Sequence, residues 1–126
     1  MVRREMKKIM VVDNEPDIVD LTRTVLELGG YQVVTAYSGE ECLRRLEKEK
    51  VDLVLLDIMM PGMSGWMLSD RLKENPLWKN IPVVFLTART DNFAKEAGNA
   101  LCADYIEKPF DIEDLRERVE KILNIN

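Results

Sequence analysis

Four polar side chains that directly follow short apolar runs have the types needed to bind a divalent cation and a phosphoryl group. They are Asp13, Asp57, Thr87 and Lys108. Carboxylates hold hard cations such as Mg²⁺ through oxygen, a hydroxyl donates a hydrogen bond, and an ammonium pairs with an anion. A carboxylate in such a setting can also be the nucleophile of phosphoryl transfer and form an aspartyl phosphate. Each residue alone is explained as a polar turn-former at a strand end, but the four complementary types together favour a shared site.

Other chemistries are excluded by composition. The chain has 0 histidines, which excludes catalytic triads, zinc sites of the usual kind and formation of phosphohistidine on this chain. Cys42 and Cys102 lack C-x-x-C spacing, so we interpret them as reduced thiols of a cytoplasmic protein.

Five β-rich apolar runs alternate with amphipathic stretches and predict five strands and five helices. The strands are expected near residues 9–12, 31–36, 53–56, 83–86 and 104–107. Because the first, third and fourth runs are continuously apolar, they predict strands buried on both faces and therefore a parallel sheet. Right-handed crossovers then place all carboxyl ends of the strands at one edge, where ligands bind in open α/β sheets.

The expected helices begin at recognisable capping residues. Asn14 is the expected cap of the first helix, and Ser38 opens a capping box with Glu41. Asp111 is the expected cap of the last helix, and a weaker helix is expected around residues 93–100. On the first helix, we expect the buried face to consist of Ile18, Leu21, Val25 and Leu28.

Length and charge point to one soluble α/β domain. The 126 residues fit a single domain, and apolar runs of four or five residues are far shorter than the roughly 18 needed to span a bilayer. Lys plus Arg is 18 and Asp plus Glu is 23, a net charge of −5. Because a negative surface repels phosphate backbones, we expect no nucleic-acid binding by this chain itself. Because the apolar runs are short, we expect no membrane association.

The motifs around these strand ends resemble those of response-regulator receiver domains. The segment Asp57-Ile58-Met59-Met60-Pro61-Gly62-Met63-Ser64-Gly65 is similar to the family's phosphoacceptor segment. Val11-Val12-Asp13, Thr87-Ala88 and Lys108-Pro109-Phe110 fall where the family has its acidic cluster, hydroxyl residue and lysine. The resemblance implies a flavodoxin-like, doubly wound sheet of strand order 2-1-3-4-5, in which ligands bind where the strand order reverses. It also implies one receiver domain over residues 1–126, with a core of about 7–124 and no output domain.

By this resemblance, Asp57 is the phosphorylated residue, and Thr87 and Lys108 contact phosphoryl oxygens. Asp13, Asp57 and the backbone carbonyl of Met59 are expected to contact Mg²⁺.

The resemblance further implies a cis peptide at Lys108–Pro109 and a rotamer change of Tyr105 on activation. The implied partners are a histidine kinase or phosphotransfer protein and a downstream protein target. The implied role is a signalling switch that catalyses only its own phosphoryl transfer and dephosphorylation. The pathway and the oligomeric state stay open.

Asn14 departs from the family pattern and keeps a second hypothesis open. Most active members have an acidic metal ligand at this position, whereas Asn14 offers only a neutral amide oxygen. The alternative is therefore a protein-binding module of the same fold that works without phosphorylation. A metabolic enzyme on a similar sheet is disfavoured because the sequence has no Gly-rich phosphate loop.

Overall fold

The computed structural model describes residues 6–88 and 104–124, with only the backbone described at Thr87. In chain order, the elements are β1 (Lys8–Val12), α1 (Pro16–Leu28), β2 (Gln32–Ala36), α2 (Gly39–Leu46), β3 (Leu53–Leu56), α3 (Gly65–Glu74), β4 (Val83–Thr87), β5 (Asp104–Glu107) and α5 (Ile112–Leu123). Each strand lies within one residue of its expected bounds. The helix expected around residues 93–100 lies outside the described residues, so four of the five expected helices are seen.

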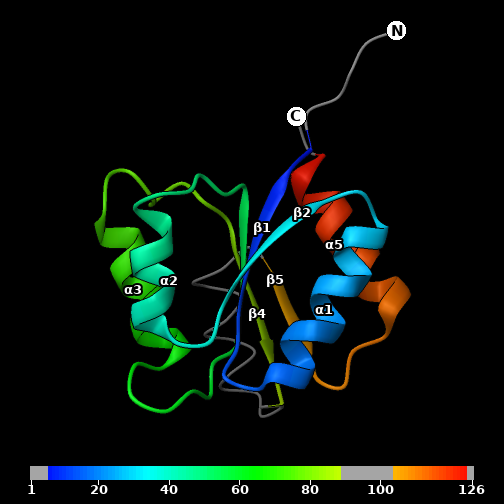
Figure 1. Cartoon of the computed structure of the whole chain (residues 1–126), viewed down its shortest axis with the longest axis horizontal. Coiled ribbons are helices and arrows are strands. Elements are labelled where there is room, and N and C mark those ends of the chain that lie inside the picture. The colour runs from blue at the N-terminus through cyan, green and yellow to red at the C-terminus, as the bar shows by residue number, and fades with distance from the viewer. Residues whose placement is uncertain (1–5, 89–103, 125–126) are drawn as a thin grey trace, which may run out of the picture.

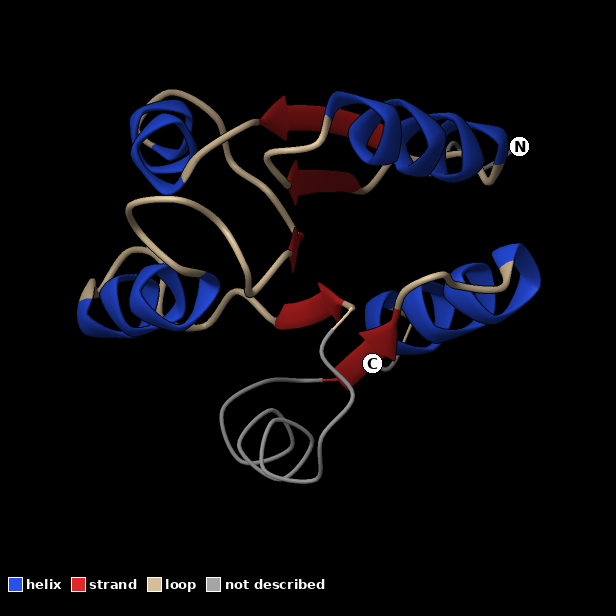
Figure 2. Cartoon of the chain, turned by 90° about the horizontal axis from the view of Figure 1, so that it is seen from below, coloured by secondary structure: helices blue, strands red, loops and turns tan. Residues whose placement is uncertain are grey.

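The described strands form one parallel sheet of order β2-β1-β3-β4-β5, which confirms the expected topology. Helices α1 and α5 cover one face of this sheet, and α2 and α3 cover the other (Figures 1 and 2). The sheet is therefore sandwiched between two helical layers, as the continuously apolar strands predicted.

Alternating side chains of the central strands pack into two separate hydrophobic cores, one on each face of the sheet. On β1, Ile9 and Val11 pack with the α1 and α5 residues, whereas Met10 and Val12 pack with the α2 and α3 residues. All four side chains are at most 1% exposed. Because successive strand residues point to opposite faces, an apolar residue at every position is what a strand covered on both sides requires.

The α2–α3 core also contains Cys42. This residue is a free, buried thiol, and burial raises its pKa to about 12. It therefore stays protonated and serves in packing; Cys102 lies outside the described residues.

Two of the three expected helix caps are confirmed. The side chain of Ser38 accepts a hydrogen bond from the Glu41 N–H (3.1 Å), and that of Asp111 accepts one from the Asp114 N–H (3.0 Å). The prediction for Asn14 is wrong, because the N-cap of α1 is Glu15, which makes no side-chain capping bond. Pro16 is the first helical residue, the position that proline prefers, and this shifts the helix start one residue past Asn14.

The predicted buried face of α1 is also wrong in part. Leu21 is 46% exposed and Leu28 is 80% exposed. The buried residues of α1 are Val19, Thr22, Val25 and Leu26. Aliphatic residues lie on two adjacent stripes of this helix that share Val25, so helical periodicity alone does not choose between them.

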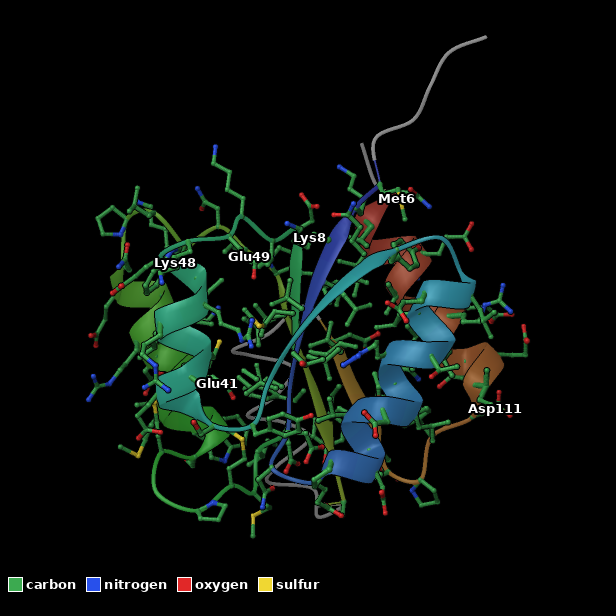
Figure 3. All side chains as sticks on the ribbon, viewed as in Figure 1. Met6, Lys8, Glu41, Lys48, Glu49 and Asp111 are labelled. Carbon is green, nitrogen blue, oxygen red and sulfur yellow. The ribbon has the colours of Figure 1, made fainter. Side chains whose placement is uncertain are left out.

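Helices begin at the carboxyl edge of the sheet and end at the amino edge. In Figure 3, Glu41 at the start of α2 and Asp111 ahead of α5 lie toward one end of the molecule. Lys8 and Glu49 lie at the other end and form an ion pair of 3.6 Å. No helix within residues 6–88 and 104–124 is long and apolar enough to cross a membrane.

Candidate functional site

Three of the predicted site residues meet at the carboxyl edge of the sheet. Asp13 follows β1, Asp57 follows the neighbouring β3, and Lys108 follows β5. The ammonium Nζ of Lys108 lies 2.6 Å from Asp13 Oδ2 and 3.5 Å from Asp57 Oδ1. Since β4 lies between β3 and β5, the Lys108 side chain reaches back past one strand to make these contacts.

Backbone hydrogen bonds hold both aspartates in place. The Asp57 N–H donates to Val12 O (2.9 Å) and the Asp13 N–H donates to Ala36 O (3.1 Å). The Asp13 side chain is fixed as well, because its Oδ1 accepts from the Glu15 N–H (3.0 Å). The backbones of both aspartates thus continue the hydrogen bonds of the parallel sheet beyond β1 and β3.

Burial makes the ionised form of Asp57 costly. Asp57 is 3% exposed, and Asp13 is 1% exposed. Burial and the nearby charge of Asp13 raise the pKa of Asp57 from 3.8 to about 6, although Lys108 and the Met59 N–H act in the opposite direction. The single ammonium therefore leaves negative charge at this edge incompletely compensated.

Lys108 stays charged in this environment. Burial alone lowers the pKa of its ammonium, but the hydrogen bond to Asp13 and the charges of Asp13, Asp57 and Glu15 outweigh that effect. The net result is a raised pKa. The site therefore presents a fixed positive charge between two buried carboxylates.

Within the described atoms, the other predicted site residues take no part in the side-chain ion pairs that join Asp13, Asp57 and Lys108. Asn14 is exposed. Met59 is 61% exposed, so the part of Met59 that can act at Asp57 is its backbone rather than its side chain. Thr87 ends β4 opposite Glu107, but its hydroxyl is outside the described atoms. Tyr105 is 7% exposed and packs in the α2–α3 core rather than at the surface.

Comparison with known proteins identifies the family. Residues 9–120 match the response regulator receiver domain family. The chain belongs to this family. The receiver is 43% identical over 118 residues to the alkaline phosphatase synthesis transcriptional regulatory protein PhoP of Bacillus subtilis, covering 93% of this chain and 48% of PhoP. It is 40% identical to response regulator SaeR of Staphylococcus epidermidis, covering 94% and 51%. The chain thus spans about half the length of these curated relatives.

Solved structures agree with the assignment. A putative response regulator from Chloroflexus aurantiacus superposes with a TM-score of 0.89 at 36% identity, covering 94% of this receiver and 98% of that chain. Chemotaxis protein CheY4 of Vibrio cholerae gives 0.88 at 29% identity, covering 94% and 100%. The response regulator TrrA of Thermotoga maritima, solved in complex with Mg²⁺-BeF, gives 0.84 at 36% identity, covering 94% and 100%. The chain is accordingly a receiver domain of a two-component system, a class of signalling switches.

The donor set of this receiver fits a hard divalent cation, but with few anionic ligands. Within the described ranges, no group of three or more His, Cys, Asp and Glu residues is arranged to hold a metal ion. The buried anionic oxygens are those of Asp13 and Asp57, and carboxylate oxygens are ligands that hard cations prefer. Because the Asp57 pKa is raised by burial and by Asp13, a cation at this edge would relieve that electrostatic cost.

Other residues complete the surroundings, and among them the motifs did not single out Glu15. Glu15 Oε1 lies 3.7 Å from Lys108 Nζ, and the Lys108–Pro109 peptide is cis, as expected. Gly65 packs directly on the backbone of Asp57 and Ile58. Gly65 ends the segment that resembles the phosphoacceptor motif, but the contact itself arises from tertiary packing.

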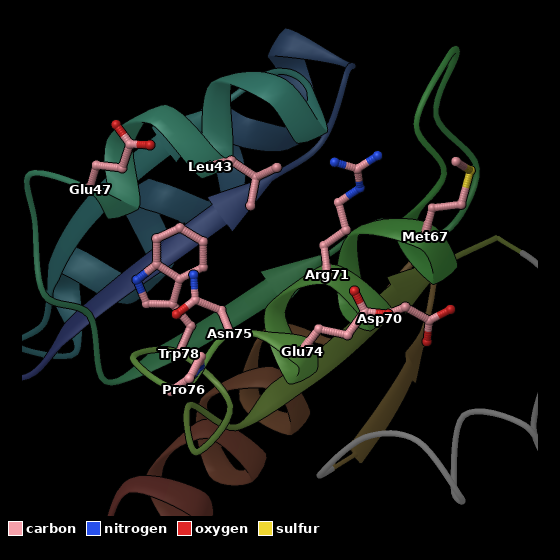
Figure 4. Close-up of a pocket in the computed structure, with 9 residues that line it drawn as sticks. All are labelled: Leu43, Glu47, Met67, Asp70, Arg71, Glu74, Asn75, Pro76 and Trp78. Carbon is pink, nitrogen blue, oxygen red and sulfur yellow. The ribbon is translucent and has the colours of Figure 1, made fainter.

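A hollow lies away from these residues. It has a volume of about 740 Å³ and lies between α2 and α3 (Figure 4). Its lining includes Leu43, Arg71 and Trp78 and does not include Asp13, Asp57 or Lys108. This hollow is therefore separate from the candidate site.

Proposed function

We propose that this receiver domain accepts a phosphoryl group on Asp57. The observation that carries the proposal is the placement of the Lys108 ammonium against two buried carboxylates, Asp13 and Asp57, at the carboxyl edge of the sheet. The donor is a phosphohistidine of a histidine kinase or phosphotransfer protein. Because the chain contains 0 histidines, that phosphohistidine belongs to a separate protein or to a sequence outside these residues.

The transfer is a displacement at phosphorus. An Asp57 carboxylate oxygen forms the new O–P bond while the N–P bond of the phosphohistidine breaks, and the imidazole leaves with the bonding electron pair. Lys108 pairs with a phosphoryl oxygen, exchanging part of its contact with Asp13 for the incoming anion. By resemblance, the Thr87 hydroxyl donates to another phosphoryl oxygen.

We propose that Asp13, Asp57 and the Met59 carbonyl hold Mg²⁺ during this reaction. When bound, Mg²⁺ neutralises the negative charge that gathers between the carboxylates and the phosphoryl oxygens. The two carboxylates supply the anionic donors, and backbone hydrogen bonds to the parallel sheet hold both aspartates in place.

The output surface in this proposal is formed by β5, α5 and the helix expected around residues 93–100. Lys108 directly follows β5, so a change in its partner acts on that strand. Arg118 of α5 donates to Asp104 (2.8 Å) and to the Tyr105 carbonyl (3.1 Å), which ties α5 to β5. A downstream protein that binds one arrangement of this surface better than the other then reads the phosphorylation state.

We place this reaction in the cytoplasm, with residues 7–124 as the receiver unit and with protein rather than nucleic acid as its direct partners. The net charge of −5 supports the absence of a direct nucleic-acid role.

The second candidate function is that of a phosphorylation-independent binding module. Asn14 favours it, because it leaves two carboxylates where a third anionic ligand is usual.

Intact-mass measurement after incubation with acetyl phosphate and Mg²⁺ separates these functions. We expect one added phosphoryl group on the wild type, none on Asp57→Ala, and an unchanged gain on Asp70→Ala, which removes an exposed carboxylate of α3. No gain by a folded wild type at any Mg²⁺ concentration favours the binding module. Equal gain by Asp57→Ala contradicts the assignment of the phosphoacceptor.

A further inference from the structure

The segment that joins β3 to α3, residues 57–64, rests directly on the first residue of α3. The Gly65 N–H donates to Ile58 O at 2.9 Å. A Cβ atom on Gly65 would overlap the carbonyl oxygen of Asp57 and lie 2.7 Å from Ile58 Cα. These are backbone atoms, so no side-chain rotation could make room. The Asp57–Ile58 peptide can therefore pack at this position only because residue 65 is a glycine and has no side chain.

The same segment is also wedged against the start of α2. A Cβ atom on Gly39, the first residue of α2, would lie 2.6 Å from Met63 Sδ and 3.1 Å from Met63 Cβ. Met63 is 8% exposed, and Gly62, just before it, has a φ of 74°, a conformation that glycine adopts without strain. The Met63 side chain thus occupies the space that Gly39 leaves open.

The position of this segment matters at Asp57 itself. The Met59 N–H acts on the Asp57 carboxylate and lowers its pKa, while the Asp57 N–H is fixed to β1 through Val12 O (2.9 Å). If the far end of the segment shifts, Met59 moves relative to Asp57, whose backbone β1 keeps in place. Ile58 and Met60 of the segment are also buried in the α2–α3 core, and Met63 adds the contact that joins the far end of the segment to the start of α2.

We propose that Met63, seated against Gly39, is a positioning residue that holds the Asp57–Met59 peptides in the geometry needed for phosphoryl transfer. This inference rests on the proposed function, because Asp57 is its reacting group. It extends the site to two residues that contact neither the phosphoryl group nor its donor.

A double-mutant cycle over Gly39→Ala and Met63→Ala tests the proposal. Rates of phosphoryl uptake from acetyl phosphate are followed by intact mass at saturating Mg²⁺, and Mg²⁺ midpoints are followed by Trp fluorescence. We expect Gly39→Ala to slow uptake by about threefold or more when Met63 is present, as coupled neighbours do. In the Met63→Ala background the new methyl group enters vacated space, so the same change has a much smaller effect. Equal effects of Gly39→Ala in both backgrounds overturn the proposal.

Gly30→Ala is the matched control for a general loss of stability. Gly30 has a φ of 94° in the turn before β2, at the amino edge of the sheet, and a Cβ atom there would meet only open space. The substitution strains the backbone and lowers the unfolding temperature, yet uptake at a temperature where the protein is folded should not change. If Gly30→Ala slows uptake as much as Gly39→Ala does, stability rather than position explains both, and the proposal fails.

Gly65→Ala adds a second arm. Its Cβ meets backbone rather than the flexible Met63 side chain, so we expect a loss of uptake that Met63→Ala does not restore. Restoration by Met63→Ala contradicts the geometry. A wild type that takes up no phosphoryl group disproves the proposed function instead, and the Mg²⁺ midpoints of the cycle still report on positioning: coupled midpoints support it and additive ones overturn it.

Discussion

Lys108 and Asp13 are separated by 95 positions in the sequence, and their side chains form a buried ion pair of 2.6 Å. The distance from Lys108 to Asp57 is longer, 3.5 Å. In this state the ammonium is therefore held mainly by Asp13, which leaves Asp57 as the less neutralised of the two carboxylates. That inequality suits the role that we propose for Asp57, whose oxygen would act as the nucleophile.

Removing the Lys108 ammonium should reveal the repulsion between the carboxylates of Asp13 and Asp57. Lys108→Met keeps much of the aliphatic stem but leaves two buried carboxylates without their cation. We expect a loss of about 2–4 kcal/mol in the free energy of unfolding at pH 7 without Mg²⁺, because breaking a buried pair leaves uncompensated charge. Urea unfolding measures this loss. The control, Lys121→Met on the exposed face of α5, should change stability by less than about 0.5 kcal/mol.

The raised pKa of Asp57 predicts a specific pH dependence of stability. Its pKa in the folded state is about 6, above its usual value of 3.8. The neutral form is therefore favoured by folding, and the associated stability is present below pH 3.8 and lost as the pH rises through about 6. Asp57→Asn removes this titration. In metal-free buffer, we expect the variant to be more stable than the wild type at pH 7–8 by on the order of 2–3 kcal/mol, with the difference vanishing near pH 4. A difference that is the same at both pH values argues against a strained carboxylate.

Asn14→Asp should change the site in two opposite directions. A third anionic oxygen strengthens binding of a hard cation, so we expect a lower Mg²⁺ midpoint in a Trp fluorescence titration. The same charge adds repulsion beside Asp13 and Asp57, so the metal-free variant should unfold at a lower temperature. Both proteins should take up a phosphoryl group at saturating Mg²⁺. Uptake by the variant alone would move the wild type to the phosphorylation-independent class.

Arg118 should govern how tightly α5 is held to β5. Its guanidinium pairs with Asp104 at 2.8 Å and Asp114 at 3.1 Å, and these partners raise its pKa. Arg118→Ala should speed amide exchange in residues 104–124 while leaving β1 and β3 protected.

Phosphorylation, or a beryllium fluoride mimic, should alter exchange in the wild type mainly over residues 87–110. Changes confined to α1 would contradict the proposed output surface.

Much of the fold follows from the sequence because parallel strands covered on both faces need apolar residues throughout. Val54 and Leu55, for example, serve opposite cores. The meeting of Asp13, Asp57 and Lys108 follows from the same logic, since parallel strands end at one edge. The burial of Val19 rather than Leu21 does not follow, because two apolar stripes of α1 compete and only packing against the sheet selects one.

The finer features of the site depend on tertiary structure. The preference of Lys108 for Asp13 over Asp57 depends on side-chain geometry, and the pKa of Asp57 depends on burial by segments distant in sequence. Gly39 illustrates the same limit. A glycine that starts a helix has an ordinary local explanation, and its close approach to Met63 exists only once the 57–64 segment is folded onto α2.

Chemical mapping of the phosphorylated residue tests the central claim most directly. Borohydride reduces an aspartyl phosphate to homoserine, so the wild type is phosphorylated with Mg²⁺, reduced, digested and sequenced by mass spectrometry. We predict homoserine at position 57 and at no other aspartate, with none formed when the phosphodonor is omitted. Homoserine at Asp13 or at another aspartate, with Asp57 unchanged, would contradict the account.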